Sequence, residues 1–164
     1  METGFSTIRP KAAAARVDPA LSVVEWMSKT VFAAQTDRAL VDVLEIMTDH
    51  RVRHVPIMDG ERLVGIISDR DVRNALARRN AASGGHIDAA SPLLRRASEV
   101  MTRCPLTIPR DFSIHEAAEI MCREKIGALP VMDGERMVGI ISTEDLLWAL
   151  MQITNEGRPS QASL

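Results

Sequence analysis

Two short segments of the chain place a serine three residues before an aspartate. Ser68 precedes Asp71 and Ser142 precedes Asp145, each after the apolar run Gly-Ile-Ile. This spacing is typical of a helix N-cap, where both side chains hydrogen-bond free backbone N–H groups. The same N–H groups can bind a phosphate, and a carboxylate one turn into the helix can accept two hydrogen bonds from a ribose diol. These residues therefore fit either helix capping alone or capping combined with nucleotide binding.

No catalytic arrangement accompanies these pairs. None of the histidines has a serine or cysteine partner in a recognisable motif, and no phosphate-binding segment of the GxxxxGK type is present. Cys104 and Cys122 form no Cys-x-x-Cys pair, and we expect reduced thiols. We expect that the chain is not an enzyme and binds no metal ion.

The chain contains one unit twice, at an offset of 74 residues. Glu25–Leu76 aligns without a gap to Glu99–Leu150, with 20 identities in 52 positions. Such a repeat fixes the architecture before any residue is given a role. We expect the two units to pack about a pseudo-twofold axis, so that any site between them occurs twice.

Hydrophobic spacing predicts the order β-α-β-β-α in each unit, which gives an α+β fold. The first unit has predicted elements at Thr30–Ala34, Ala39–His50, Val52–Met58, Arg62–Ile67 and Asp69–Arg79. The second has them at Leu106–Ile108, Ser113–Glu124, Ala128–Met132, Arg136–Ile141 and Thr143–Gln152. Gly65 and Gly139 lie inside predicted strands, where glycine usually marks the close approach of a backbone or a ligand.

Composition excludes several classes of protein. The formal net charge of −2 argues against a general nucleic-acid binder. No apolar run is long enough to span a membrane, and residues 1–20 lack a signal-peptide core, so we expect a cytoplasmic protein. We divide the chain into a flexible N-terminal arm (1–20), a first repeat (21–79), a linker (80–97), a second repeat (98–152) and a flexible tail (153–164).

The repeated unit resembles the CBS (cystathionine-β-synthase) domain. The resemblance is carried by a strand in which proline is followed by a hydrophobic residue (Val55-Pro56-Ile57 and Leu129-Pro130-Val131), an Asp-Gly turn and a closing Gly-Ile-Ile-Ser-x-x-Asp motif, all present in both copies. Two such domains in tandem resemble a CBS pair, or Bateman module. The resemblance implies a regulatory module that binds adenosine-containing molecules in clefts between the repeats.

The resemblance also implies where a ligand would bind. Ser68, Asp71, Ser142 and Asp145 would contact ribose or phosphate, and the adenine of each site would lie against the opposite repeat. The Asp71 site would use Cys104, Pro105, Leu106, Ile126, Gly127 and Ala128. The Asp145 site would use Thr30, Val31, Phe32, Val52 and Arg53.

The two expected sites differ in charge. Arg53 and His54 of the first repeat correspond to Gly127 and Ala128 of the second. We therefore expect the Asp71 site to combine the small Gly127 with Arg53, His54 and Arg70 as cations for phosphate. Ordinary surface polarity is the alternative interpretation of Arg53 and His54.

We expect the chain to sense an adenine nucleotide such as AMP, ADP or ATP, which is a ligand and not a catalytic cofactor. The alternatives are an S-adenosylmethionine or NAD sensor, and a constitutive dimerisation or scaffold module with vestigial clefts. Apolar side chains on the predicted helices, and the resemblance, indicate a homodimer. They are Met47, Met121, Leu147, Trp148 and Met151. An effector protein is a further possible partner.

Overall fold

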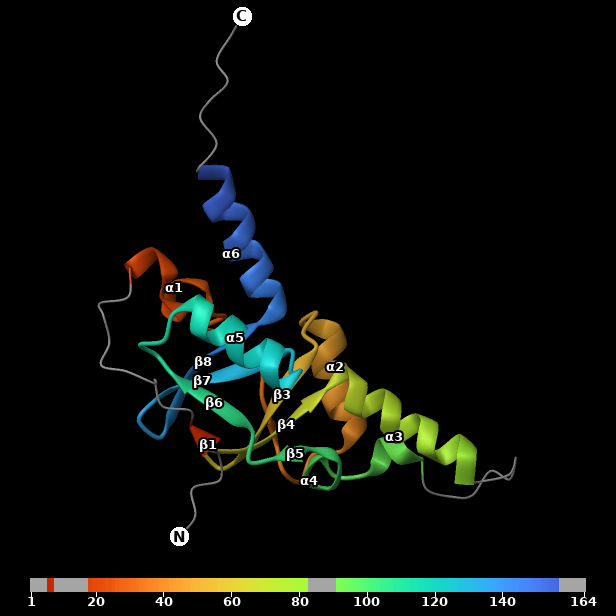
Figure 1. Cartoon of the computed structure of the whole chain (residues 1–164). Helices are drawn as coiled ribbons and strands as arrows, with labels where there is room; N and C mark the ends of the chain where they lie inside the picture. The colour runs from red at the N-terminus through yellow and green to blue at the C-terminus, as the bar shows by residue number, and fades with distance from the viewer. Residues whose placement is uncertain (1–5, 8–17, 83–90, 157–164) are drawn as a thin grey trace, which may run out of the picture.

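The computed structural model describes residues 6–7, 18–82 and 91–156 of the chain. Both repeats have the predicted order β-α-β-β-α (Figure 1). The first repeat contains β2 (Ala34–Gln35), α2 (Leu40–Asp49), β3 (His54–Asp59), β4 (Arg62–Ser68) and α3 (Asp69–Ala82). The second contains β6 (Leu106–Pro109), α5 (Ile114–Glu124), β7 (Ala128–Asp133), β8 (Arg136–Ser142) and α6 (Thr143–Glu156).

Each repeat is built on a four-stranded sheet. The strand orders are β2-β3-β4-β5 and β1-β6-β7-β8, and the central pairs β3–β4 and β7–β8 are antiparallel hairpins. The hairpin turns contain Gly60 and Gly134, with φ of +62° and +61°. Glycine adopts this left-handed conformation without a Cβ clash, so the predicted Asp-Gly turns are confirmed.

Two short helices are exchanged between the repeats. α1 (Val23–Trp26) precedes the first repeat in the sequence, but Val23 and the following Met27 are buried in the core of the second. α4 (Ala97–Val100) precedes the second repeat, and Ala97 is buried in the core of the first. Each core is thus completed by a helix from the other half of the sequence.

The strands show the same exchange. β5 (Thr102–Arg103) pairs with β4 in the first sheet. Ser28, the equivalent of Thr102, forms a bridge to Ile140 in β8, with N···O distances of 2.9 and 3.1 Å. The contact that the second repeat makes with the first sheet therefore has an equivalent, shifted by 74 residues, that the first repeat makes with the second sheet. This equivalence confirms the predicted pseudo-twofold packing.

The exchange explains the glycines inside β4 and β8. A Cβ on Gly65 would lie 2.8 Å from Cγ of Met101, and a Cβ on Gly139 would lie 3.0 Å from Cγ of Met27. Both methionines directly follow an exchanged helix. The sequence predicted a close approach to a backbone or a ligand. At Gly139 the Ser28 carbonyl oxygen lies 3.0 Å from the Cβ position, which confirms a close backbone, whereas at Gly65 the close neighbour is the Met101 side chain.

The cores are mainly aliphatic, as the composition predicts, with Phe112 buried in the second. The largest fully buried side chains include Leu40, Ile57, Leu63, Ile67, Ile108, Leu129, Met132 and Ile141. Met47 and Met121 are 7% and 5% exposed and belong to these cores, so the expectation that they contribute to an uncovered apolar surface is wrong. Leu147, Trp148 and Met151 on α6 are more than half exposed, as predicted.

The remaining elements lie before and between the repeats. They are β1 (Ser6–Thr7), and the 3-10 turns η1 (Pro19–Leu21) and η2 (Pro92–Leu94). The predicted strand Thr30–Ala34 is present only at its end, as β2. Its counterpart β6 is longer, and β1 pairs with β6 at Leu106 and Thr107, a partner that the first sheet lacks in the described residues. Among those residues no helix is long and apolar enough to cross a membrane.

Candidate functional site

Ser68 and Asp71 form a reciprocal cap at the start of α3. Oδ2 of Asp71 accepts hydrogen bonds from the Ser68 backbone N–H at 2.8 Å and from the Ser68 hydroxyl at 2.6 Å. The Asp71 N–H donates to Oγ of Ser68 at 3.3 Å. This arrangement satisfies N–H groups that the helix itself leaves free. It also holds the half-buried Asp71 carboxylate where β4 ends and α3 begins.

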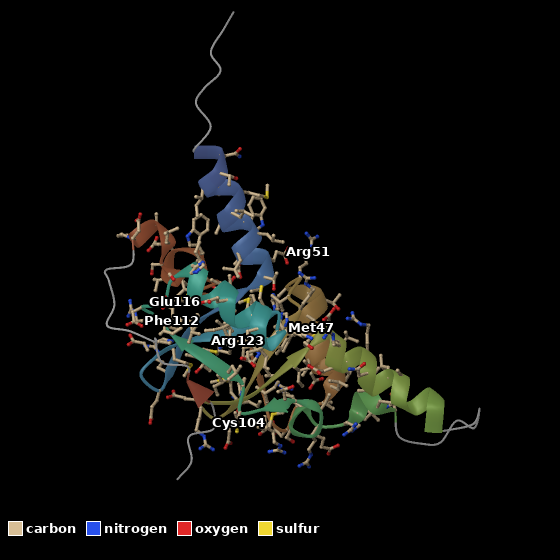
Figure 2. All side chains as sticks on the ribbon, viewed as in Figure 1. Met47, Arg51, Cys104, Phe112, Glu116 and Arg123 are labelled. Atoms are coloured by element: carbon tan, nitrogen blue, oxygen red, sulfur yellow. The ribbon has the colours of Figure 1, made fainter. Side chains whose placement is uncertain are left out.

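The same geometry recurs twice in the chain. Ser142 and Asp145 form it at the start of α6, with both contacts to Oδ2 of Asp145 at 2.7 Å. Ser113 and Glu116 form it at the start of α5, with contacts of 2.9 and 2.8 Å. Figure 2 shows Glu116 and Arg123 toward opposite ends of α5. Because a cap also occurs at α5, capping alone does not identify a binding site.

The caps leave one oxygen of each aspartate open. Within the described residues, no hydrogen bond reaches Oδ1 of Asp71 or Oδ1 of Asp145. A carboxylate held through one oxygen is fixed in orientation and keeps acceptor sites on the other. The arrangement can therefore accept hydrogen bonds from a pair of hydroxyl groups.

His54 connects the surroundings of Asp71 to the second repeat. A Cβ on Gly127 would lie 2.9 Å from both Cε1 and Nε2 of His54, so the imidazole of the first repeat packs against the backbone of the second. Burial lowers the pKa of His54 and outweighs the opposing effect of Asp69; Arg53 lowers it further and Asp71 raises it. We call the region around Asp71, His54 and Gly127 the first junction.

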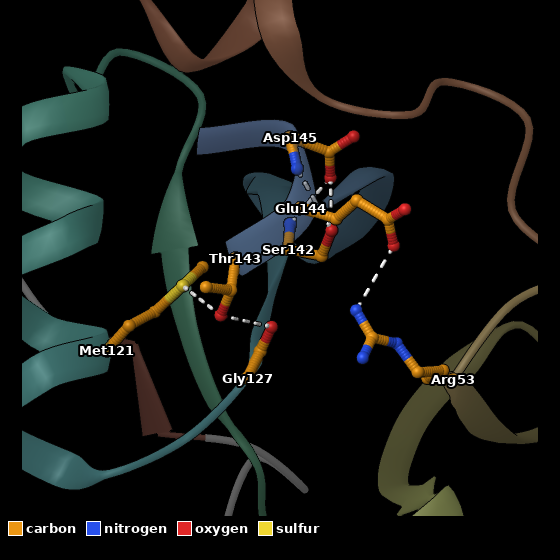
Figure 3. A network of polar contacts seen from close by, with 7 residues as sticks. All are labelled: Arg53, Met121, Gly127, Ser142, Thr143, Glu144 and Asp145. Atoms are coloured by element: carbon orange, nitrogen blue, oxygen red, sulfur yellow. Dashed lines mark hydrogen bonds and ion pairs between the residues drawn. The ribbon is translucent and has the colours of Figure 1, made fainter. Parts of the chain in front are cut away.

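Arg53 lies beside the other aspartate. Its guanidinium donates to Oε2 of Glu144 at 3.2 Å, and Glu144 directly precedes Asp145 (Figure 3). The contact joins the residue before β3 in the first repeat to the first turn of α6 in the second. We call the region around Asp145, Glu144 and Arg53 the second junction. Arg53 was expected at both sites, with its charge serving the Asp71 site, whereas the structure pairs its guanidinium with Glu144 beside Asp145.

Equivalent backbone contacts within each repeat fix the start of α3 and of α6. The carbonyl of Gly127 accepts hydrogen bonds from the Thr143 N–H at 3.0 Å and from its hydroxyl at 3.2 Å (Figure 3). The carbonyl of Arg53 accepts from the Asp69 N–H at 3.0 Å. The residue before each proline-containing strand therefore fixes the first turn of the helix that carries the aspartate.

Arg70 is the cation nearest in sequence to Asp71. It is exposed, and it forms no ion pair with any residue that the structure describes. Its neighbour Asp69 is paired with Arg73 at 2.7 Å. Arg70 thus keeps its charge available at the first turn of α3.

The residues proposed for adenine have mixed environments. Pro105 and Ala128 are buried, Leu106, Ile126 and Val31 are half-buried, and Thr30 and Cys104 are exposed. Cys104 has a φ of +49°, and its N–H donates to the Val64 carbonyl at 3.2 Å. Their role in adenine binding stays a prediction.

Sequence reasoning missed two contacts. Glu144 was not among the predicted site residues. The difference in charge between equivalent positions, Arg53 against Gly127 and Arg70 against Glu144, was a sequence signal for its role. The stacking of Phe32 on His50, with ring centroids 3.5 Å apart and an interplanar angle of 5°, had no sequence signal. Within the described residues no group of three potential metal ligands exists.

Comparisons with known proteins agree on one family. A family model described as "CBS domain" matches residues 23–78 and 97–152. A CBS domain-containing protein of Dictyostelium discoideum is 32% identical over 134 residues, which cover 80% of this chain and 92% of that protein.

Two solved structures share the fold. The CBS domain pair of protein MJ0100, in complex with 5′-methylthioadenosine and S-adenosyl-L-methionine, has a TM-score of 0.67 and 28% identity, and the match covers 79% of this chain and 98% of that one. CBSX2 in complex with AMP has a TM-score of 0.66 and 22% identity, over 81% of this chain and 98% of that one.

Proposed function

Because the chain belongs to the CBS domain family and contains two such domains, we propose that it is a regulatory module that binds an adenine nucleotide of the AMP, ADP or ATP type where the repeats meet. In this proposal the module has no catalytic activity, and the nucleotide is a signal. The first junction is the principal site.

One observation carries the proposal. His54 of the first repeat pairs with Ser68 in the β3–β4 hairpin and packs on Gly127 of the second repeat, so both repeats contribute to the surroundings of the capped Asp71 carboxylate. With Oδ2 of Asp71 held by Ser68, the other oxygen is presented at the same junction. A ligand that bridges the two repeats can then change their packing, which is the action expected of a sensor.

The solved relatives support the ligand class. The MJ0100 pair is described in complex with two adenosine compounds, and CBSX2 in complex with AMP. In this chain Asp71 would accept hydrogen bonds from the ribose diol, and Arg70 would meet the phosphate near the N-terminus of α3. His54 would donate a hydrogen bond from its ring.

Titration calorimetry with adenosine, AMP, ADP and S-adenosylmethionine tests the proposal. At the first junction AMP and ADP should bind more tightly than adenosine or S-adenosylmethionine, and added salt should weaken binding because exposed charges are screened over about 8–10 Å. A thermal-shift screen that includes ATP and NAD gives the range of ligands. A larger shift with S-adenosylmethionine or NAD than with any adenine nucleotide would favour those alternatives.

A scaffold without a ligand is the second candidate function. It is favoured by the apolar face of α6, where Leu147, Trp148, Leu150 and Met151 are each 55–57% exposed. Such a face is typical of an association surface. If the full screen gave no shift while the chain formed a stable dimer, the scaffold function would replace the sensor.

A further inference from the structure

The two junctions carry different arrangements of charge at equivalent positions. Arg70 at the first junction corresponds to Glu144 at the second, and Gly127 at the first corresponds to Arg53 at the second. The cation therefore comes from the capped helix itself at the first junction. At the second junction it comes from the opposite repeat, and an acid occupies the helix position.

This difference changes the charge that a ligand would meet. At the first junction, Asp69 is paired with Arg73 at 2.7 Å, which leaves Arg70 to balance Asp71. At the second junction, Arg53 forms its ion pair with Glu144 at 3.2 Å. Within the described residues no cationic side chain pairs with the Asp145 carboxylate. The second junction is therefore the more acidic of the two.

A phosphate at the second junction would meet two obstacles. It would lie near the carboxylates of Glu144 and Asp145, and like charges brought together oppose binding. It would also have to compete with Glu144 for Arg53, although the pair itself is weak because the two side chains are 62% and 63% exposed. The repulsion, more than the ion pair, would disfavour the phosphate.

We propose that Glu144 determines ligand choice at the second junction: its own charge repels phosphate and it pairs with Arg53, which leaves the site to adenosine compounds whose 5′ group is uncharged or cationic. One chain would then bind two different classes of adenosine compound. This inference rests on the proposed function, because it requires that the junctions bind adenosine compounds at all.

Calorimetry on the Asp71→Ala chain isolates the second junction, with AMP, 5′-methylthioadenosine and S-adenosylmethionine as probes. If Asp71→Ala unfolds, Asp71→Asn, which keeps an oxygen acceptor for the cap, takes its place. We expect 5′-methylthioadenosine and S-adenosylmethionine to bind at least about tenfold more tightly than AMP, the order expected for opposing like charges.

Glu144→Gln in that background is the decisive variant. It removes one charge and frees Arg53, so AMP affinity should rise about tenfold while the affinity for 5′-methylthioadenosine changes little. Adding Arg53→Ala should remove the part of the AMP gain that comes from the freed guanidinium, and leave the part that comes from the lost carboxylate. Glu135→Gln, which removes an exposed carboxylate in the β7–β8 turn, is the matched control and should leave every affinity unchanged.

The outcomes separate this inference from the proposed function. AMP binding as tight as that of 5′-methylthioadenosine before the Glu144 change, or an unchanged ratio after it, would overturn the role of Glu144. Absence of any binding at the second junction would do the same, while AMP binding to the first junction would still support the proposed function. If the unsubstituted chain bound no adenosine compound, the proposed function and this inference would both be overturned.

Discussion

At the scale of single residues, the serine–acid pair occurs in three places and has two possible meanings. Ser68–Asp71 and Ser142–Asp145 lie at the junctions, whereas Ser113–Glu116 caps α5 with the same hydrogen bonds. The third pair is therefore an internal control, since it provides the cap without a place in the proposed site.

Asp71→Ala should reduce AMP affinity by about 1.5–3 kcal/mol, the usual contribution of hydrogen bonds to a charged group. The loss of the cap should lower the free energy of unfolding by about 1 kcal/mol. Calorimetry and denaturant unfolding measure the two effects. Asp145→Ala should reduce AMP affinity less than Asp71→Ala does. Glu116→Ala should lower the free energy of unfolding without changing AMP affinity. Equal losses of affinity in the two aspartate variants would contradict the assigned difference between the junctions.

His54 predicts a pH dependence. Burial lowers its pKa, so the unfolded chain binds the proton more readily than the folded one. This contribution to stability is complete above the ordinary value of 6.5 and is lost as the pH falls through the lowered pKa. The free energy of unfolding should therefore decrease below pH 6.5, by at most about 1.4 kcal/mol per pH unit from this group.

Denaturant unfolding between pH 5 and 8 checks this effect, with His54→Gln as the comparison. The two proteins differ only at residue 54, so the difference between the two curves reports on this residue. Parallel curves would show that the environment of His54 does not shift its protonation.

The caps could be predicted from the sequence because they depend on residues three positions apart. The ion pair of Arg53 with Glu144 could not, because the two residues are 91 positions apart and meet only through the packing of the repeats. The stack of Phe32 on His50 likewise depends on how the segment before β2 runs past the end of α2.

At the scale of elements, the order of helices and strands was predictable, whereas their exchange was not. Periodicity shows where an apolar face lies but not which core covers it. The segments 23–26 and 97–100 are too short to show their partners, and only equivalent contacts in the folded chain reveal that each crosses to the other repeat.

Gly65→Ala tests this exchange. The new Cβ would collide with Met101, so we expect the free energy of unfolding to fall by about 1–3 kcal/mol, as for other overpacked sites. In a Met101→Ala background the loss should be smaller, with a coupling of about 1 kcal/mol in a double-mutant cycle measured by denaturant unfolding. Met27→Ala is the matched control: Met27 faces Gly139, so its effect should add to that of Gly65→Ala.

At the scale of the whole molecule, α3 and α6 project from the body in different directions (Figure 1). They are equivalent helices, but their outer faces differ. Leu147 and Trp148 on α6 correspond to Arg73 and Asn74 on α3. An apolar face on only one of the two helices indicates that α6 is the stronger candidate for the predicted homodimer contact.

Trp148→Arg should dissociate the predicted homodimer. A buried tryptophan often dominates an interface, so the dimer dissociation constant should rise by about 30-fold or more in sedimentation velocity. Leu94→Arg is the matched control, because Leu94 is 67% exposed and lies outside α6. A monomer at micromolar concentration in the unsubstituted chain, with or without AMP, would contradict the dimer.

The exchanged helices also determine what happens when the polypeptide is cut. Cleavage between Gly84 and Gly85 would give two pieces of similar size, each carrying the helix that completes the other's core. Neither piece could bury its own apolar surface alone, so each should be unstructured in isolation, and mixing them should restore the fold. The two fragments should therefore fold only together, and circular dichroism should show secondary structure in the mixture but not in either fragment alone.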